Sequence, residues 1–219
     1  MSCKRNYKIC YVKRRSITIY AKEVIFLIKG FVFEDFKSFQ KAELFLEDIT
    51  TLIGTNASGK SNVIEGIEIL SEIASGKDLA TILDGSRNSD SFVRGGSKGC
   101  CRFKATSFGL GCLIDLDEKQ DLLYKIKISV SERIYVEDES LTVVANGSMQ
   151  RKGLKIFYTK PATDKKSANI QVVYRNGKKG NNPGTSLLRD MAILPQMKAM
   201  QSEDDLVLNE NAKYIGMML

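Results

Sequence analysis

The chain has 219 residues, of which 43% are hydrophobic and 27% are charged, and its formal net charge is +7 at pH 7. This composition predicts one globular domain, or part of a larger one, and no apolar run approaches the roughly 18 residues of a membrane span. The sequence has no histidine and no C-x-x-C pair among its five cysteines, which argues against histidine-dependent catalysis, a zinc site and a disulfide framework and favours the cytoplasm.

The excess of positive charge belongs to the start of the chain. Residues 1–29 contain eight Lys or Arg and one acid, so the remaining residues hold 25 of each sign. Residues 1–23 therefore form a basic leader, which is typical of a solvated extension, a nucleic-acid arm or a transit peptide.

Apolar runs then predict strands ahead of a loop. Val24–Ile28 leads through Phe31–Phe33 to Phe36-Lys37-Ser38-Phe39, and a second run covers Ala42–Leu46. The β-branched and apolar segment Thr50–Ile53 predicts a short buried strand that enters the loop. From Ser61 onward the spacing is helical until Ser75-Gly76 stops it. The apolar positions of that helix are Val63, Ile64, Ile67, Leu70, Ile73 and Ala74.

The loop between them, residues 54–61, fits the pattern G-x-x-x-x-G-K-[ST] at every fixed position. Gly54 and Gly59 are expected to have positive φ, so that backbone N–H groups point at phosphates. Lys60 would place a charge on the β- and γ-phosphates, and Ser61 would be a Mg²⁺ ligand. The sequence therefore predicts an ATP and Mg²⁺ site. Its expected contacts are Gly54, Thr55, Asn56, Ala57, Ser58, Gly59, Lys60, Ser61 and Asn62.

The order Phe36-Lys37-Ser38-Phe39, a short strand and then residues 54–67 resembles the N-terminal half of the ABC-type ATPase heads of the SMC, RecF and OLD-nuclease group. These AAA family ATPases share an F-[KR]-S-F element and G-x-N-G-S-G-K-S-N, followed by an aliphatic pair, an acid, a small residue and isoleucine. This chain departs at Ala57, where the family has glycine, and at Gly66, where it usually has alanine. Ala57 is tolerable if its φ is negative.

After that helix, Lys77–Leu83 is expected to extend the helical region, and the composition of residues 84–90 predicts a loop. Arg87 or Arg94 is either a phosphate contact or a solvated side chain. From Cys101 to Arg175 the sequence alternates with a period of two, as in Tyr124–Val130. This pattern predicts an antiparallel sheet of five or six strands, with turns at Asn146-Gly147 and Asn176-Gly177.

Basic residues in the second half of this sheet favour either a DNA-backbone surface or a solvated face with hairpin tips. They are Arg151, Lys152, Lys155, Lys160, Lys165, Lys166, Arg175, Lys178 and Lys179. In the last segment, residues 181–219, helical spacing runs from Leu187 to Leu194 and ends at Pro195. The apolar end Met217–Leu219 is expected in a chain cut within a domain, or in one that meets a partner.

A complete head of the resembled group also has a signature loop, which reaches a second head, and four apolar residues followed by Asp-Glu. Neither motif is found here. Leu70–Ile73 is not a signature loop, and Leu113–Glu118 resembles the Asp-Glu motif only superficially, since Asp115 interrupts its apolar run. Asp117-Glu118 is therefore either an acid pair or, more simply, a polar turn. No glutamine is placed convincingly for the loop that senses the γ-phosphate, although Gln150 lies at a plausible distance along the sequence. The resemblance implies the first lobe of a head.

The expected fold class is mixed α/β: a P-loop NTPase lobe over residues 24–95 with preceding antiparallel strands, an antiparallel sheet over 96–180 and a short C-terminal helical segment. The resemblance implies an ATP-binding part of an ATPase in DNA repair, chromosome maintenance or phage defence. Its implied partners are a second head, in a homodimer or higher oligomer, a nuclease subunit and DNA. The alternatives are a small-molecule kinase and a non-enzymatic nucleotide-responsive module.

Overall fold

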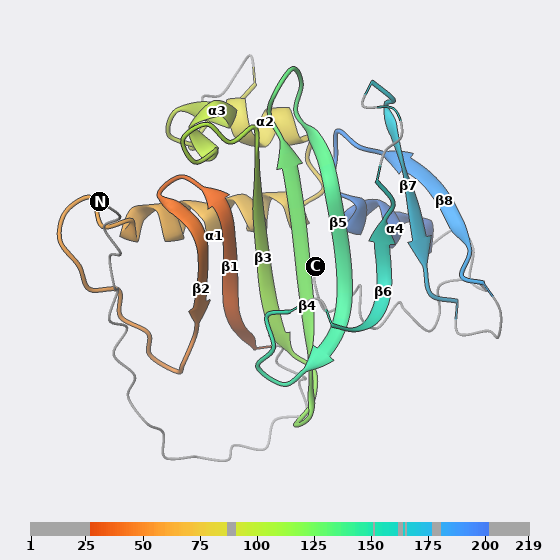
Figure 1. Cartoon of the computed structure of the whole chain (residues 1–219), viewed down its shortest axis with the longest axis horizontal. Helices are drawn as coiled ribbons and strands as arrows, with labels where there is room; N and C mark the ends of the chain where they lie inside the picture. Colours follow the sequence, from red (N-terminus) through yellow and green to blue (C-terminus); the bar gives the residue numbers. More distant parts are fainter. Residues whose placement is uncertain are drawn as a thin grey trace.

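The computed structural model describes residues 27–86, 91–150, 152–161, 164, 166–176 and 181–201. In these ranges it contains an eight-stranded sheet and four helices (Figure 1). The mixed α/β class and the antiparallel sheet expected from the sequence are confirmed. The basic leader 1–23, Arg87 and the apolar end Met217–Leu219 lie outside the described residues. No helix in the described ranges has the length and apolarity needed to cross a bilayer.

All neighbouring strands of the sheet are antiparallel, in the order β2-β1-β3-β4-β5-β6-β7-β8. Only β1 departs from chain order, because it lies between β2 and β3. The strands are β1 (Ile28–Phe36), β2 (Phe39–Phe45), β3 (Ser107–Asp115), β4 (Gln120–Ser129), β5 (Tyr135–Ala145), β6 (Gly153–Thr159), β7 (Asn169–Tyr174) and β8 (Gly184–Leu188).

Alternation along β4 explains how the sheet separates its two faces. Tyr124, Ile126 and Ile128 belong to the main core, whereas Lys125 and Lys127 lie on the other face. Successive side chains of a strand point to opposite faces, so the alternation read from the sequence is confirmed.

The helices α1 (Lys60–Ala74) and α4 (Ile193–Gln201) lie on one face of the sheet, behind it in Figure 1. Two shorter helices, α2 (Leu79–Asp84) and α3 (Gly96–Cys100), follow α1 at one end of the strands. The side chain of Asp78 caps α2 by accepting a hydrogen bond from the amide of Thr81 at 3.0 Å.

The helix α1 begins and ends where the sequence predicts, but one residue of its expected apolar face is wrong. The buried residues are Val63, Glu65, Gly66, Ile69, Leu70 and Ile73. Ile64 is 50% exposed, because the buried stripe is rotated toward Glu65 and Gly66.

Phenylalanine rings from the β1–β2 hairpin explain why residue 66 is glycine. The ring centroids of Phe33 and Phe36 lie 6.1 Å apart, and those of Phe33 and Phe39 lie 5.5 Å apart. A Cβ atom on Gly66 would lie only 2.7 Å from a ring carbon of Phe33. The departure from the family's alanine is therefore matched by the large ring that packs against it.

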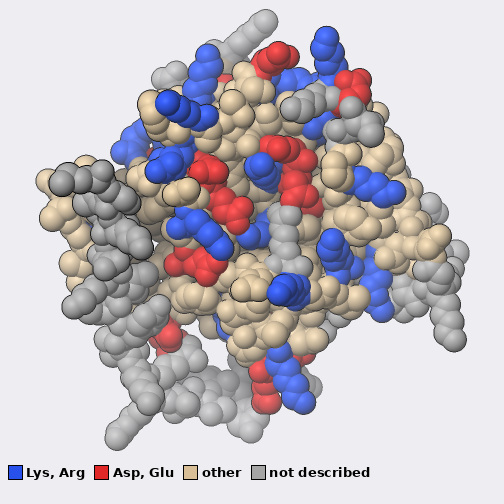
Figure 2. Space-filling view, viewed as in Figure 1, with Lys and Arg blue, Asp and Glu red and all other residues tan. Residues whose placement is uncertain are grey.

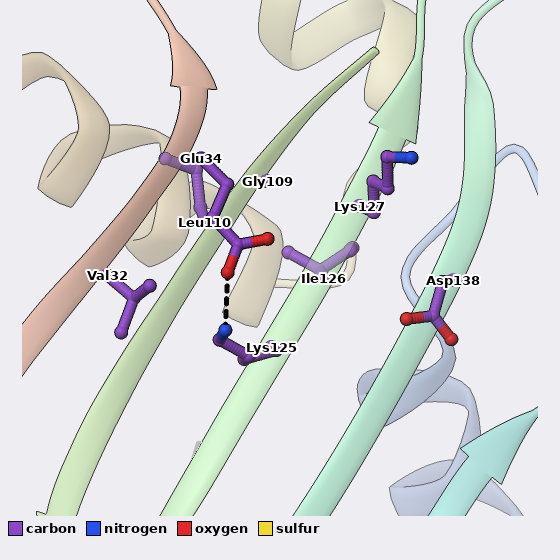
Figure 3. Close-up of a pocket in the computed structure, with 8 residues that line it drawn as sticks. All are labelled: Val32, Glu34, Gly109, Leu110, Lys125, Ile126, Lys127 and Asp138. Atoms are coloured by element: carbon purple, nitrogen blue, oxygen red, sulfur yellow. Dashed lines mark hydrogen bonds and ion pairs between the residues drawn. The ribbon is translucent and has the colours of Figure 1, made fainter. Parts of the chain in front are cut away.

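None of the four described helices covers the opposite face of the sheet. Part of it is a small apolar cluster of Val32, Leu113, Leu123, Val144 and Met149. The rest carries charges of both signs, and Figure 2 shows acidic side chains between the basic ones across the middle of this face. One hollow of about 240 Å³ lies beside Gly109 (Figure 3). Its lining includes an ion pair in which Glu34 Oε1 and Lys125 Nζ lie 2.5 Å apart.

The C-terminal segment differs from the sequence prediction. The helical spacing assigned to Leu187–Leu194 is wrong, since residues up to Leu188 form β8, paired to β7. Helix α4 starts at Ile193 and contains Pro195 in its first turn. A proline there loses no helical hydrogen bond, so Pro195 lies in the first turn of this helix and does not end one.

Candidate functional site

The 54–61 loop and the start of α1 lie against the β1–β2 turn. The side-chain amide of Asn62 donates to Ser38 Oγ at 2.9 Å. A Cβ atom on Gly59 would lie 2.9 Å from Ser38 Oγ and 3.0 Å from the Phe39 ring. The Ser38-Phe39 half of the F-[KR]-S-F element therefore packs directly against the end of the loop.

A buried ionic cluster holds the first turns of α1 to the same hairpin. The carboxylate of Glu65 lies 2.8 Å from Lys37 Nζ and 2.9 Å from a guanidinium nitrogen of Arg94, and it also accepts the Arg94 amide at 2.7 Å. The side chains of Lys37 and Glu65 are 8% and 5% exposed. Burial opposes the charge of Glu65, but the hydrogen bonds from Lys37 and Arg94 outweigh it and lower its pKa.

The sequence did not single out Lys37, Ser38 and Glu65 as site residues. Lys37 and Arg94 are 57 residues apart, and they meet only because β1, α1 and the segment before α3 converge. The resemblance was the sequence signal that could have found them. Lys37 belongs to its F-[KR]-S-F element, and Glu65 is the acid that follows its aliphatic pair.

The backbone of the loop differs from the expectation at two of three positions. Gly59 has φ of 99° and precedes α1 directly. Gly54 does not have positive φ. A Cβ atom there would lie 2.6 Å from Ser58 Oγ, so a side chain at this position would require the Ser58 hydroxyl to turn away. Ala57 has φ of 62°, so the condition of a negative φ is not met and this alanine is strained.

Lys60 is the first residue of α1, and its side chain turns back into the loop. Its ammonium donates to the carbonyls of Gly54 at 2.6 Å and Thr55 at 2.9 Å. No side chain among the described residues caps the N-terminus of α1. The positive end of the helix dipole and the Lys60 charge thus act on the same loop.

The expected strand at Thr50–Ile53 is not formed. These residues have no strand partner, and Ile53 is 82% exposed. A strand requires a neighbour for its hydrogen bonds, and the outer strand β2 on this side ends at Phe45.

Ser61 lies at a shallow hollow of about 250 Å³ beside the helix. The hollow is also lined by Ile64, Glu65, Glu68, Phe92 and Arg94. Arg94 is oriented here by Glu65 and by the side-chain oxygen of Asn62, at 3.0 Å from its guanidinium. Its side chain is 63% exposed. Among the described residues there is no group of three or more acidic or cysteine side chains that could hold a metal by themselves.

The candidate acid pair lies at the other end of the sheet. Gly109 pairs with Glu34 near the β1–β2 turn, whereas Ile114 pairs with Ile28 at the far end of β1. At about 3.3 Å per residue, the β3–β4 turn with Asp117-Glu118 therefore lies about 25 Å along β3 from Gly109, which is beside the β1–β2 turn. Asp117 accepts the amides of Lys119 and Gln120, both at 2.8 Å, which is the turn role considered from the sequence.

Gln150 is also distant from the 54–61 loop. It lies in the β5–β6 connection, and Ala145 at the end of β5 pairs with Gln120 beside the β3–β4 turn. Leu70–Ile73 lie in the last turns of α1, as expected for residues that are no signature loop.

The basic residues of the second half are only partly described. Arg151, Lys165, Lys178 and Lys179 lie outside the described residues. Lys152, Lys160 and Lys166 are exposed, and the ammonium of Lys155 lies 4.4 Å from the centroid of the Tyr158 ring. The exposure of these lysines fits both alternatives from the sequence, a DNA-backbone surface and a solvated face.

The positive φ of Ala57 gives a first testable prediction. Ala57→Gly should raise the free energy of unfolding by about 0.5–1 kcal/mol, because relief of left-handed strain exceeds the added entropy of the unfolded chain. Urea unfolding measures the change. Ala57→Val should lower stability, since a branched side chain is worse at positive φ. An Ala57→Gly variant less stable than the wild type would contradict the strained backbone.

One comparison with known proteins agrees with the motif. A protein-family model described as "AAA ATPase domain" matches residues 28–213. No curated protein matches the chain. A solved structure described as "Structure of the recombination mediator protein RecF-ATP in RecFOR pathway" is similar at 18% identity and a TM-score of 0.34. That match covers 57% of this chain and 29% of the other, so this chain spans less than a third of that protein.

Proposed function

The chain belongs to the AAA ATPase domain family, and from this premise we propose that it binds Mg-ATP at residues 54–62. The observation that carries the proposal is the geometry at the start of α1. A left-handed Gly59 precedes a 15-residue helix with no side-chain cap among the described residues, and the Lys60 ammonium lies over the loop. Such a helix start binds anions through its N–H groups and its dipole.

Each residue of the loop has a role in this proposal. Gly54 and Gly59 let the backbone approach the phosphates, and Lys60 supplies a compact positive charge. Ser61 supplies the hydroxyl that would bind Mg²⁺, which prefers oxygen ligands and shares them with phosphates. Asn62 links the site to the hairpin through Ser38. A bound Mg²⁺ would neutralise charge on the phosphates during hydrolysis.

We further propose that hydrolysis requires a second head or lobe. The acid pair Asp117-Glu118 lies at the far end of the sheet and makes hydrogen bonds within its own turn. In the resembled heads, an acid beside the nucleotide orients water, and two heads enclose two ATP molecules. The distance of this acid pair from Ser61 also favours the alternative of a nucleotide-responsive module without turnover.

The experiment is calorimetry of Mg-ATP binding to the whole chain, with phosphate release followed in the same samples. We expect saturable, magnesium-dependent binding and no turnover above background. Absence of binding by a folded sample would contradict the site. Turnover that disappears in Lys60→Ala would contradict the need for a second head and would show that this chain supplies its own acid.

The biological role remains a proposal from the resemblance: DNA repair, chromosome maintenance or phage defence in the cytoplasm. A second head, a nuclease subunit and DNA are the proposed partners. DNA as a partner is supported by three exposed lysines, Lys152, Lys160 and Lys166.

A further inference from the structure

A buried carboxylate far from the 54–61 loop contacts the start of α4. Glu139, on β5, is fully buried. Its Oε2 accepts the amide of Ile193 at 2.7 Å, and its Oε1 accepts the amide of Leu194 at 2.8 Å and the hydroxyl of Tyr124 at 3.1 Å. Glu139 therefore caps α4 from the neighbouring sheet.

Among the described residues, no Lys or Arg bonds to the Glu139 carboxyl. Its described partners are two backbone N–H groups and a phenol, and none is Lys or Arg. The titratable groups near it are Tyr124 on β4, Asp138 on β5 and, beyond Tyr124, Cys112 on β3. Burying an anion without a cation is costly, and the like charge of Asp138 adds to the cost.

These surroundings favour the neutral form of the carboxyl while α4 is in place. Burial raises the pKa of Glu139 to about 7 from its ordinary value of 4.5, although the hydrogen bonds from Ile193, Leu194 and Tyr124 lower it. The neutral carboxyl keeps partners, because the Tyr124 hydroxyl can turn and accept its proton.

The segment at the start of α4 also contacts the turn between α1 and α2. The amide of Leu79, at the start of α2, donates to the carbonyl of Asp190 at 2.9 Å. A Cβ atom on Gly76, just after α1, would lie 3.2 Å from the Cβ atom of Pro195. The start of α4 therefore joins the sheet to the turn between α1 and α2.

We propose that Glu139 is a proton-dependent clasp for α4: its neutral carboxyl holds the start of the helix on the sheet, and its ionisation favours release. The sign follows from linkage, since release exposes Glu139 and returns it to its ordinary acidity. The contribution to docking is complete at acidic pH and is lost as the pH rises toward 7. This inference does not depend on nucleotide binding.

Hydrogen exchange of the α4 amides in the whole chain tests the clasp, with rates corrected for the intrinsic effect of pH. In the wild type, the equilibrium constant for local opening of α4 should rise on the order of a hundredfold between pH 5 and pH 8. In Glu139→Gln this pH dependence should disappear. Glu137→Gln is the matched control, because Glu137 is on the same strand, is 42% exposed and pairs with Lys127.

Three outcomes would overturn the clasp: a wild-type opening constant that does not change with pH, a pH dependence that persists in Glu139→Gln, or exchange of α4 only through global unfolding. If Glu139→Gln does not fold, an NMR titration of the wild-type Glu139 carboxyl carbon decides. A midpoint near 7 supports the proposal, and a midpoint below 5 overturns it.

Discussion

Lys60→Ala is expected to weaken Mg-ATP binding by about 100-fold while leaving the fold intact. Hydrogen bonds to charged groups contribute roughly 1.5–3 kcal/mol each, and about 1.4 kcal/mol corresponds to tenfold in affinity. The Lys60 ammonium lies over the loop, bound to the carbonyls of Gly54 and Thr55. Calorimetry gives the change in affinity, and a thermal melt checks that the variant is folded.

Lys77→Ala is the matched control for the loss of one lysine. Lys77 lies just beyond the opposite end of α1 from Lys60, and its side chain pairs with Glu72. Its removal changes the net charge equally but should leave the affinity for Mg-ATP unchanged. Equal weakening in both variants would mean that overall charge, rather than the 54–61 loop, attracts the nucleotide.

Glu65→Gln is expected to lower the free energy of unfolding by ~3 kcal/mol, the largest stability effect anticipated for this chain. The variant removes the charge that faces the nearly buried Lys37 and leaves that ammonium without its counter-ion. It also weakens the hold of residue 65 on Arg94 beside Ser61, where Asn62 remains as the other side-chain partner. Urea unfolding with a linear extrapolation measures the difference.

A second variant separates the cost of an orphaned charge from the loss of an attraction. Lys37→Met combined with Glu65→Leu replaces the buried pair by apolar side chains and should recover part of the stability lost in Glu65→Gln. Glu68→Gln, at an exposed position of the same helix, should change stability by less than about 0.5 kcal/mol. A Glu65→Gln variant as stable as Glu68→Gln would contradict a buried ionic cluster.

Local sequence patterns predicted much of this fold, because strand alternation and helical spacing report burial directly. The alternation around Tyr124–Val130 and the helix after Lys60 are examples. The prediction for Leu187–Leu194 was wrong because its apolar spacing also suits a helix. In the structure, Leu187 and Leu188 pair with β7, and Pro195 is tolerated in the first turn of α4.

The candidate site was predicted at its loop but not in its supports. The motif identified Gly54–Ser61 from residue types alone. The positive φ of Ala57 and the ion pairs of Glu65 depend on how the hairpin, α1 and the segment at Arg94 meet. Such tertiary contacts leave no periodic pattern in one sequence.

The order of the strands also bears on how this protein folds. From β3 to β8 each strand pairs with the next one in the chain, so these pairings close short loops. The pairing of β1 with β3 must instead enclose β2, the 54–61 loop and the first three helices. Closing a longer loop costs more entropy, and pairings distant in sequence form more slowly. We therefore expect the β3–β8 meander to assemble first as the template, and the segment proposed to bind nucleotide to reach its native shape last.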